Sequence, residues 1–337
     1  MAGYLLGIDA GATKTAFILY DLERNRAWQL YGGCGNHEGL PGGYAELEKM
    51  MEAHLNRLCA CTGVTLKDIA GAGLGVAGVD TRRQHGIIAG IFSKIGLERF
   101  ALANDAVLGI KAECDAGICA VNGTGFCVYG IDRQGQTAQV GGLDQLSGDL
   151  GGGKVYAQRA LAAVYSELEK GGPKTAMTGG ALSILGITDP GLFAERVSEC
   201  MESPDSAMYI RGMSMLLHDC AGAGDAVASS ILRASGEEYA RCVHGVLRHL
   251  TGLAENGNVN LILVGSCFLR ASCGLTRQSM EQKLKELCPE ITFSIRPIGT
   301  EPVAGALFWA LEQAGLNGDR ELEMRVRQAA ESAENIG

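Results

Sequence analysis

Two short β-hairpins with glycine at the turn constrain the fold of this chain more than any other feature of its sequence. The first joins apolar runs at Tyr4–Ile8 and Ala16–Tyr20. The second joins apolar runs at Gly117–Asn122 and Phe126–Ile131. Each hairpin is followed by segments with helical spacing of apolar residues. This repetition predicts a duplicated α/β unit, with two domains of related fold.

The remaining elements follow from runs of buried-type residues and from helical periodicity. Helices are predicted at residues 44–61, 83–95, 105–113, 153–169, 225–250, 275–287 and 302–314, and strands at 28–31, 69–76, 100–103, 136–140 and 259–264. The segment after Gly315 is polar and charged, and it is predicted as an exposed helix or a frayed tail.

Glycine is the outlier of the composition, because 49 of 337 residues are about twice the average usage. With only 7 Pro and 20% charged residues, this excess is not a signature of disorder. Glycine is therefore expected in turns and at places where the backbone approaches a ligand.

Charge and hydropathy exclude several functional classes. The formal net charge of −9 argues against a nucleic-acid binder, which normally carries a basic face. A run of about 18 apolar residues, which a membrane span requires, does not occur, and residues 1–4 lead into a strand without a secretory signal. The 12 Cys are dispersed and form no CxxC pair, so we expect a reduced, cytoplasmic protein without a membrane or nucleic-acid partner.

Two familiar glycine motifs are interpreted as misleading. Residues 73–78 spell GxGxxG, but they lie inside a predicted strand, which favours a close-packed strand crossed by other backbone. Residues 148–154 spell GxxxxGK, but Val155 stands where a phosphate loop requires Ser or Thr. Lys154 is more simply an early helix residue.

A third, distributed pattern is more informative, because each of its pieces lies at the end of a predicted strand. Asp9 precedes the first hairpin turn, which contains Gly11, Ala12, Thr13, Lys14 and Thr15. Asn104 and Asp105 join a strand to a helix, Gly123, Thr124 and Gly125 form the second hairpin turn, and Gly265 and Ser266 end a late strand.

These residue types suit phosphoryl transfer. Glycine turns let backbone N–H groups converge on an anion, while Thr13, Thr124 and Lys14 add donors. Phosphoryl transfer further requires a metal ion and a base for the acceptor hydroxyl. Asp9 suits the surroundings of Mg²⁺. Asp105 suits the base, although an aspartate at the start of a helix is equally well explained as an N-cap.

The same residues resemble a known family. The sequence is similar, over roughly residues 4–312, to the BadF/BcrA-type ATPases of the actin-like and sugar-kinase superfamily, and within them to the N-acetylglucosamine kinases. GIDAGATKTAFILYD at 7–21 resembles the first phosphate loop, and AVNGTGFCVYG at 120–130 resembles the second. GLGVAGVD at 73–80, ALANDAVLG at 101–109, LILVGSCF at 261–268 and EPVAGALFWAL at 301–311 resemble the other family segments.

This resemblance implies an ATP-dependent hexosamine kinase with Asp105 as general base and Asp9 near Mg²⁺. ATP would contact the turns at 11–15 and 123–125, and its nucleoside would lie by Gly265 and Ser266. It also implies two actin-like (ribonuclease H-like) domains with an ATP cleft between them. The expected domains are 1–116 and 117–300, with the helix at 302–314 packing back on the first and a polar tail at 315–337.

The resemblance also implies the sugar contacts. They would come from Asn36, His37, Ala77, Gly78, Asn104, Asp105, Gly142 and Asp149. Three departures fall in the segment GGLDQLSGDLGGG at 141–153. Leu150 replaces the usual Glu, Gly152 replaces a Ser, and Leu143 stands where the amino-sugar kinases tend to carry Trp. Nucleotide binding is thus better supported than N-acetylglucosamine as the acceptor, and glucosamine, a modified amino sugar or a small polyol fits as well.

Two other functions stay open. One is an ATP-driven iron–sulfur electron-transfer activator of a dehydratase or reductase, although Gly125-Phe126-Cys127 does not match the activators' Cys-Gly-rich pattern. The other is a non-catalytic actin-like nucleotide sensor. The oligomeric state is likewise open, because dimers are common among the relatives but nothing in the sequence fixes an interface.

Overall fold

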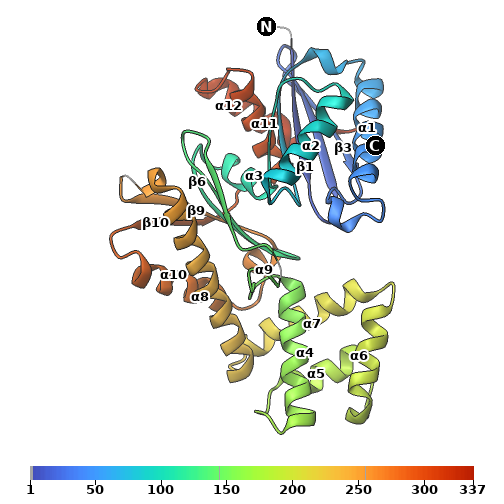
Figure 1. The fold of residues 1–337 in the computed structure, drawn as a ribbon, viewed down its shortest axis with the longest axis vertical. Helices are drawn as coiled ribbons and strands as arrows, with labels where there is room; N and C mark the ends of the chain where they lie inside the picture. Colours follow the sequence, from blue (N-terminus) through green and yellow to red (C-terminus); the bar gives the residue numbers. More distant parts are fainter. Residues whose placement is uncertain (1–2, 144, 255) are drawn as a thin grey trace. The chain divides into compact units, whose positions relative to one another are not determined.

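The computed structural model of this protein describes residues 3–143, 145–254 and 256–337. The chain forms two compact units (Figure 1). Unit 1 comprises Met1–Gly117, Gly130–Gly135 and Ile298–Gly337, and unit 2 comprises Ile118–Tyr129 and Gln136–Pro297. Unit 1 is therefore assembled from three separate stretches of sequence, including both ends of the chain.

Unit 1 contains a six-stranded sheet in the order β11-β3-β2-β1-β4-β5. Strands β1 to β3 form an antiparallel meander, and β4 and β5 continue the sheet in parallel with β1. Its elements are β1 (Tyr4–Ala10), β2 (Thr15–Asp21), β3 (Arg26–Gly32), α1 (Gly43–Thr62), β4 (Ile69–Val76), α2 (Arg82–Ile95), β5 (Phe100–Ala103), α3 (Ala106–Lys111), α11 (Pro302–Gln313), α12 (Arg320–Glu331) and β11 (Glu334–Asn335).

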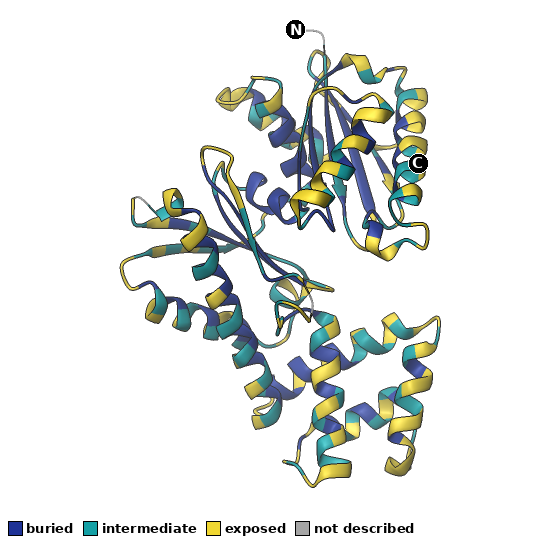
Figure 2. Ribbon diagram, viewed as in Figure 1, coloured by how far each residue is buried: buried dark blue, intermediate teal, exposed yellow. Residues whose placement is uncertain are grey.

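Both faces of this sheet are covered by helices, which is why its strands carry continuous apolar runs. Leu6 and Ile8 of β1 pack with the apolar stripes of α1 and α2. Leu5, which precedes Leu6 in the sequence and lies on the opposite face, packs with α11 and α12, which Figure 1 draws in red. Figure 2 accordingly shows these strands almost entirely buried, and all seven residues of β2 are buried.

Glycine allows α11 to cross β4 at very short range. A Cβ at Gly73 would lie 2.2 Å from the Ala306 carbonyl oxygen, and one at Gly71 would lie 2.5 Å from the Ala310 carbonyl oxygen. Gly305 on α11 makes the same kind of approach to α3, at 2.1 Å from the Leu108 carbonyl oxygen. Gly73 thus serves backbone packing, which confirms the expectation of a crossed strand, whereas Gly75 and Gly78 lie against the side chains of Leu108 and Asn36.

Unit 2 contains a five-stranded sheet in the order β10-β9-β6-β7-β8, and one of its hydrophobic cores joins this sheet to α8 and α10. Its elements are β6 (Gly117–Asn122), β7 (Phe126–Ile131), β8 (Thr137–Val140), α4 (Gly153–Lys170), α5 (Met177–Leu185), α6 (Phe193–Glu202), α7 (Ser206–Gly222), α8 (Ala226–His249), β9 (Asn258–Val264), α9 (Ser266–Leu269), α10 (Leu275–Leu287) and β10 (Thr292–Pro297).

A second core of unit 2 is built from residues of the helices α4, α5, α6 and α7 and of the first half of α8. Of these helices, α5, α6 and α7 were not predicted from the sequence. Figure 1 shows them in green and yellow beside α4. Lys154 is the second residue of α4, as the sequence indicated, so the GxxxxGK pattern ends inside a helix.

The C-terminal segment is ordered in the structure as helix α12, which is followed by β11. Leu322, Val326 and Ala329 of α12 are buried against the sheet of unit 1, and β11 pairs with β3. Among the described residues, none of the helices combines the length and the apolar character that crossing a bilayer would demand.

Candidate active site

The first hairpin turn of unit 1 is held by its own backbone. The Gly11 N–H donates to the Lys14 carbonyl at 3.0 Å, and the Gly35 N–H donates to the Gly11 carbonyl at 2.9 Å. Ala12, Thr13 and Lys14 are exposed and available to a ligand. Thr15 differs, because it is fully buried and its hydroxyl donates to the Gly33 carbonyl at 2.9 Å, which makes its side chain part of the scaffold.

The start of α3 shows which of two neighbouring residues caps the helix. The Ala106 N–H donates to Asn104 Oδ1 at 3.0 Å, so the capping side chain is Asn104. The Asn104 amide in turn donates to Asp80 Oδ1 at 2.8 Å. Capping is therefore supplied by the buried Asn104, and the carboxylate of Asp105 is left for another role.

Carboxylates gather around Asp105. Burial, followed by the negative charges of Asp9 and Asp80, raises the pKa of Asp105 to about 7, against the opposing effect of the nearby backbone amides of residues 105 and 106. Burial and the charge of Glu301 raise the pKa of Asp9 to about 6, although Lys14 acts in the opposite direction. Perturbed carboxyl groups of this kind cluster at functional sites.

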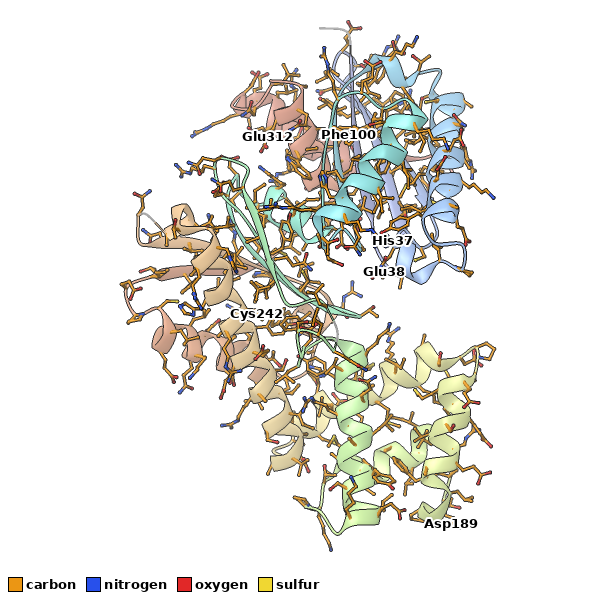
Figure 3. The ribbon with its side chains drawn as sticks, in the orientation of Figure 1. His37, Glu38, Phe100, Asp189, Cys242 and Glu312 are labelled. Atoms are coloured by element: carbon orange, nitrogen blue, oxygen red, sulfur yellow. The ribbon has the colours of Figure 1, made fainter. Side chains whose placement is uncertain are left out.

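Three of the residues proposed for the acceptor, Asn36, His37 and Gly78, lie together in unit 1. A Cβ at Gly78, which has a φ of +79°, would lie 2.5 Å from Asn36 Oδ1 and 3.0 Å from His37 Nδ1. His37 is buried and stacks on the Tyr44 ring at a centroid distance of 4.0 Å. Figure 3 labels His37 beside Glu38 in this part of unit 1. The Ala77 N–H donates to the Ala10 carbonyl at 2.8 Å, so its backbone adjoins the first turn.

Sequence reasoning missed a link between this segment and Asp80. Gln84 on α2 donates to Glu38 at 3.1 Å and accepts from the Asp80 N–H at 3.2 Å. Gln84 therefore joins Glu38, in the loop that contains Asn36, to Asp80. Asp80 in turn accepts from the amide of Asn104, the neighbour of Asp105. Thr81, three residues before Gln84, was the available signal, because the two side chains cap α2 together.

In unit 2 the second hairpin turn meets the start of α4 and the end of β9. The Gly153 N–H donates to the Gly123 carbonyl at 2.8 Å, and the Lys154 N–H donates to the Thr124 carbonyl at 3.2 Å. Gly265, with a φ of +99°, lies directly against the start of the second turn. A Cβ there would be 2.4 Å from the carbonyl group of Asn122. Thr124, Gly125 and Ser266 are exposed at this place.

Gly142 and Asp149 form the neck of a loop in unit 2. The Gly142 N–H donates to both carboxylate oxygens of Asp149, at 3.0 and 3.2 Å. Residue 144 of this loop lies outside the described residues. The carboxylate thus has a structural contact besides any contact with a ligand.

A cavity of about 760 Å³ in unit 2 was not foreseen. It lies where the end of α7, the start of α8 and the α9–α10 connection meet, and its lining includes Gly224, Ser229, Arg233, Cys273 and Gln278. The helix α9, which begins at Ser266, leads directly into this connection. The lining comes from segments some 50 residues apart, so its assembly depends on tertiary packing.

Known proteins are similar to this chain over most of its length. An N-acetylmuramic acid/N-acetylglucosamine kinase of Clostridium acetobutylicum is 24% identical over 265 residues, which are 78% of this chain and 84% of the relative. An N-acetyl-D-glucosamine kinase of Dictyostelium discoideum is 23% identical over 324 residues, which are 91% of this chain and 97% of the relative.

A solved structure from Chromobacterium violaceum, assigned as an N-acetylglucosamine kinase, matches with a TM-score of 0.62 and 21% identity, covering 92% of this chain and 99% of its own. This likeness confirms the predicted fold class, which is the actin-like fold of sugar kinases. The model of the BadF/BadG/BcrA/BcrD ATPase family matches residues 6–310. The chain therefore belongs to the BadF/BadG/BcrA/BcrD ATPase family.

Proposed function

We propose that this protein transfers the terminal phosphoryl group of ATP to a hydroxyl group of an amino sugar such as N-acetylglucosamine or glucosamine. The two curated relatives act on amino sugars by name, and each match spans most of both chains. The family is one of ATPases. The exposed glycine turns of this chain carry hydroxyl and backbone N–H groups that can donate hydrogen bonds to the phosphates of ATP.

The observation that carries this proposal is the arrangement of Asp105. Its neighbour Asn104 caps α3, so the carboxylate does not serve the helix, and its pKa of about 7 is matched to proton transfer near neutral pH. In the proposed reaction Asp105 accepts the proton of the acceptor hydroxyl as the oxygen attacks phosphorus. Asn36, His37, Ala77, Gly78 and Asn104 of unit 1 are proposed to orient the sugar.

The phosphates of ATP are assigned to the two turns. Gly11, Ala12, Thr13 and Lys14 supply one set of donors, and Gly123, Thr124 and Gly125 supply the other. The side chain of Thr15 supports the first turn from inside the sheet. Such contacts stabilise the charge that spreads over the transferred phosphoryl group.

The residues present also fit Mg²⁺. Within the described ranges, His, Cys, Asp and Glu side chains form no group of three or more that could hold a metal alone. Mg²⁺ does not require one, because it is usually held by one or two carboxylates together with substrate phosphates and water. Burial, with a further contribution from Glu301, raises the pKa of Asp9, and a bound cation would favour the charged form of this carboxylate. The ion would neutralise phosphate charge.

A coupled assay of ADP release tests this function. We expect turnover with ATP and Mg²⁺ that depends on the added sugar, in a panel of N-acetylglucosamine, glucosamine, N-acetylmannosamine, glucose and simple polyols. Mass spectrometry of the product would identify the phosphorylated sugar. ATP hydrolysis that is indifferent to every sugar would contradict the proposal.

The pKa of Asp105 makes the reaction pH-dependent. Because only the ionised carboxylate accepts a proton, kcat/KM is expected to rise with pH up to about 7 and to level off above it. Asp80→Asn keeps an oxygen for the Asn104 amide but removes a negative charge, so it is expected to move the midpoint to lower pH. Glu52→Gln, at an exposed position of α1, is the matched control and should leave the midpoint in place. A pH–rate profile of the three proteins measures this, and an unmoved midpoint in Asp80→Asn would contradict the assignment.

The cavity between the end of α7, the start of α8 and the α9–α10 connection is proposed to hold the nucleoside of ATP. Ser229→Trp would fill part of it and is expected to raise the KM for ATP roughly tenfold or more, with little change in the KM for sugar. Ala162→Trp, on the exposed face of α4, provides the control. Steady-state kinetics with each substrate varied separately would check this, and equal ATP KM values in both variants would count against the cavity.

The alternative functions receive no comparable support. The hypothesis of an iron–sulfur activator considered Cys127 as a cluster ligand, and this residue is buried within β7. A colourless, iron-free protein after anaerobic purification would count against that activity. The oligomeric state, which the sequence left open, would be determined by the mass measured by light scattering.

A further inference from the structure

A chain of buried polar side chains lies directly behind the second hairpin turn. The Asn122 amide donates to the Tyr156 hydroxyl at 2.9 Å, and that hydroxyl lies 2.8 Å from Ser235 Oγ. The Gly152 N–H donates to Asn122 Oδ1 at 3.0 Å. All three side chains have no exposed surface. Together they connect β6, α4 and α8 through hydrogen bonds that water does not reach.

This network is attached to the turn at two points. Asn122 immediately precedes Gly123, so fixing its side chain fixes the entry to the turn. Gly152, which has a φ of +88°, lies against the other side of the turn, where a Cβ would come within 2.6 Å of the Gly125 carbonyl carbon. The Asn122 amide therefore bonds Tyr156 through its nitrogen and Gly152, the residue that precedes α4, through its oxygen.

The position of Tyr156 is itself well determined. The ring packs edge-on against His218 at a centroid distance of 5.1 Å and an interplanar angle of 82°. Because the hydroxyl accepts from Asn122, its own proton is available for Ser235. Buried polar groups cost free energy unless they are hydrogen-bonded, and an apolar core would fill the same space without that cost. We therefore expect this buried polar network to hold the adjacent turn in position.

We propose that Tyr156 is a positioning residue for the phosphate-binding turn Gly123–Gly125, acting through Asn122. The inference rests on the proposed function, in which this turn holds phosphates of ATP. Tyr156 is buried beneath the turn and touches no ligand. Its hydroxyl holds the Asn122 side chain, and Asn122 orients the backbone N–H groups of the turn.

Tyr156→Phe tests the proposal, because it removes only the hydroxyl. The Kd for a nonhydrolysable ATP analogue, measured by isothermal titration calorimetry, is expected to rise about tenfold, since the buried Asn122 amide loses its partner and the turn loosens. The KM for ATP should rise in parallel, whereas the KM for sugar stays unchanged. Tyr20→Phe is the matched control, because Tyr20 is equally buried and donates to Asn25 in unit 1. Both variants are expected to melt at a lower temperature, but Tyr20→Phe should keep the wild-type Kd.

Ser235→Ala provides a second variant that keeps the bond between Asn122 and Tyr156. It is expected to raise the Kd about two- to threefold, and the double variant should be no weaker than Tyr156→Phe alone, because Ser235 acts through Tyr156. A folded Tyr156→Phe with the wild-type Kd would overturn the proposal. If Tyr156→Phe does not fold, an unchanged Kd in Ser235→Ala would overturn it. A wild-type protein that binds no ATP analogue would instead overturn the proposed function.

Discussion

Asp105→Asn is expected to lower sugar-dependent ADP release about a thousandfold, the middle of the range that general-base catalysis contributes. The amide has the shape of the carboxylate but cannot accept the proton of the acceptor hydroxyl. The capping bond from the Ala106 N–H to Asn104 stays in place, so α3 should remain intact. The Kd for a nonhydrolysable ATP analogue should change little, because the residues assigned to the phosphates are elsewhere.

The measurement combines steady-state kinetics with calorimetric binding of the analogue. Asp115→Asn, which removes an exposed carboxylate of the same unit, is the control and should keep full activity. Retention of a tenth or more of the wild-type turnover by Asp105→Asn would refute the assignment of the base. Loss of nucleotide binding together with turnover would point to a structural role instead.

Gly265→Ala is expected to weaken binding of the ATP analogue about a hundredfold. The new Cβ would lie 2.4 Å from the Asn122 carbonyl group and 2.6 Å from the Gly123 nitrogen, and both are backbone atoms that cannot rotate away. The φ of +99° adds strain to any residue other than glycine. Overpacking and strain together cost about 3 kcal/mol, and the second turn must move to relieve them.

A matched glycine separates the two causes. Gly318 has a φ of +94°, but a Cβ there meets no described atom within 4 Å. Gly318→Ala therefore carries the backbone strain without the clash, and it should leave the Kd for the ATP analogue unchanged. Calorimetric titration of both variants is the test, and equal affinity in Gly265→Ala and the wild type would contradict the placement of the second turn.

Local patterns were sufficient for the parts of the fold that depend on nearby residues. The hairpin strands, the crossed strand at 69–76 and the short strand before Asp105 follow from apolar runs that end at glycine or at polar residues. The resemblance to known kinases then joined segments that lie far apart in the sequence. The structure brings Asn36, His37 and Gly78 together, as that resemblance implied.

Other features depend on tertiary packing and could not be predicted. Asn and Asp are nearly equal as N-caps, so the sequence could not show that Asn104 caps α3 while Asp105 does not. Thr15 resembles Thr13 in sequence, but β2 is covered on both faces, and the usual alternation of polar and apolar residues is lost. The helices α5 and α6 are short, with 9 and 10 residues, and Gly179 and Gly180 weaken the signal of α5. The longer helix α7 has Gly212 in its interior.

The crossing of α11 over β4 determines when unit 1 can finish folding during synthesis. Leu307 and Leu311 of α11 complete the core over Leu5 and Ile18, yet they are made some 300 residues after the strands they cover. A ribosome that adds about 5–20 residues each second leaves that sheet face bare for tens of seconds. The long stretch of unit 2 from Gln136 to Pro297 emerges in the meantime. The nascent N-terminal sheet is thus the part of this protein with the longest exposure to chaperones and to aggregation.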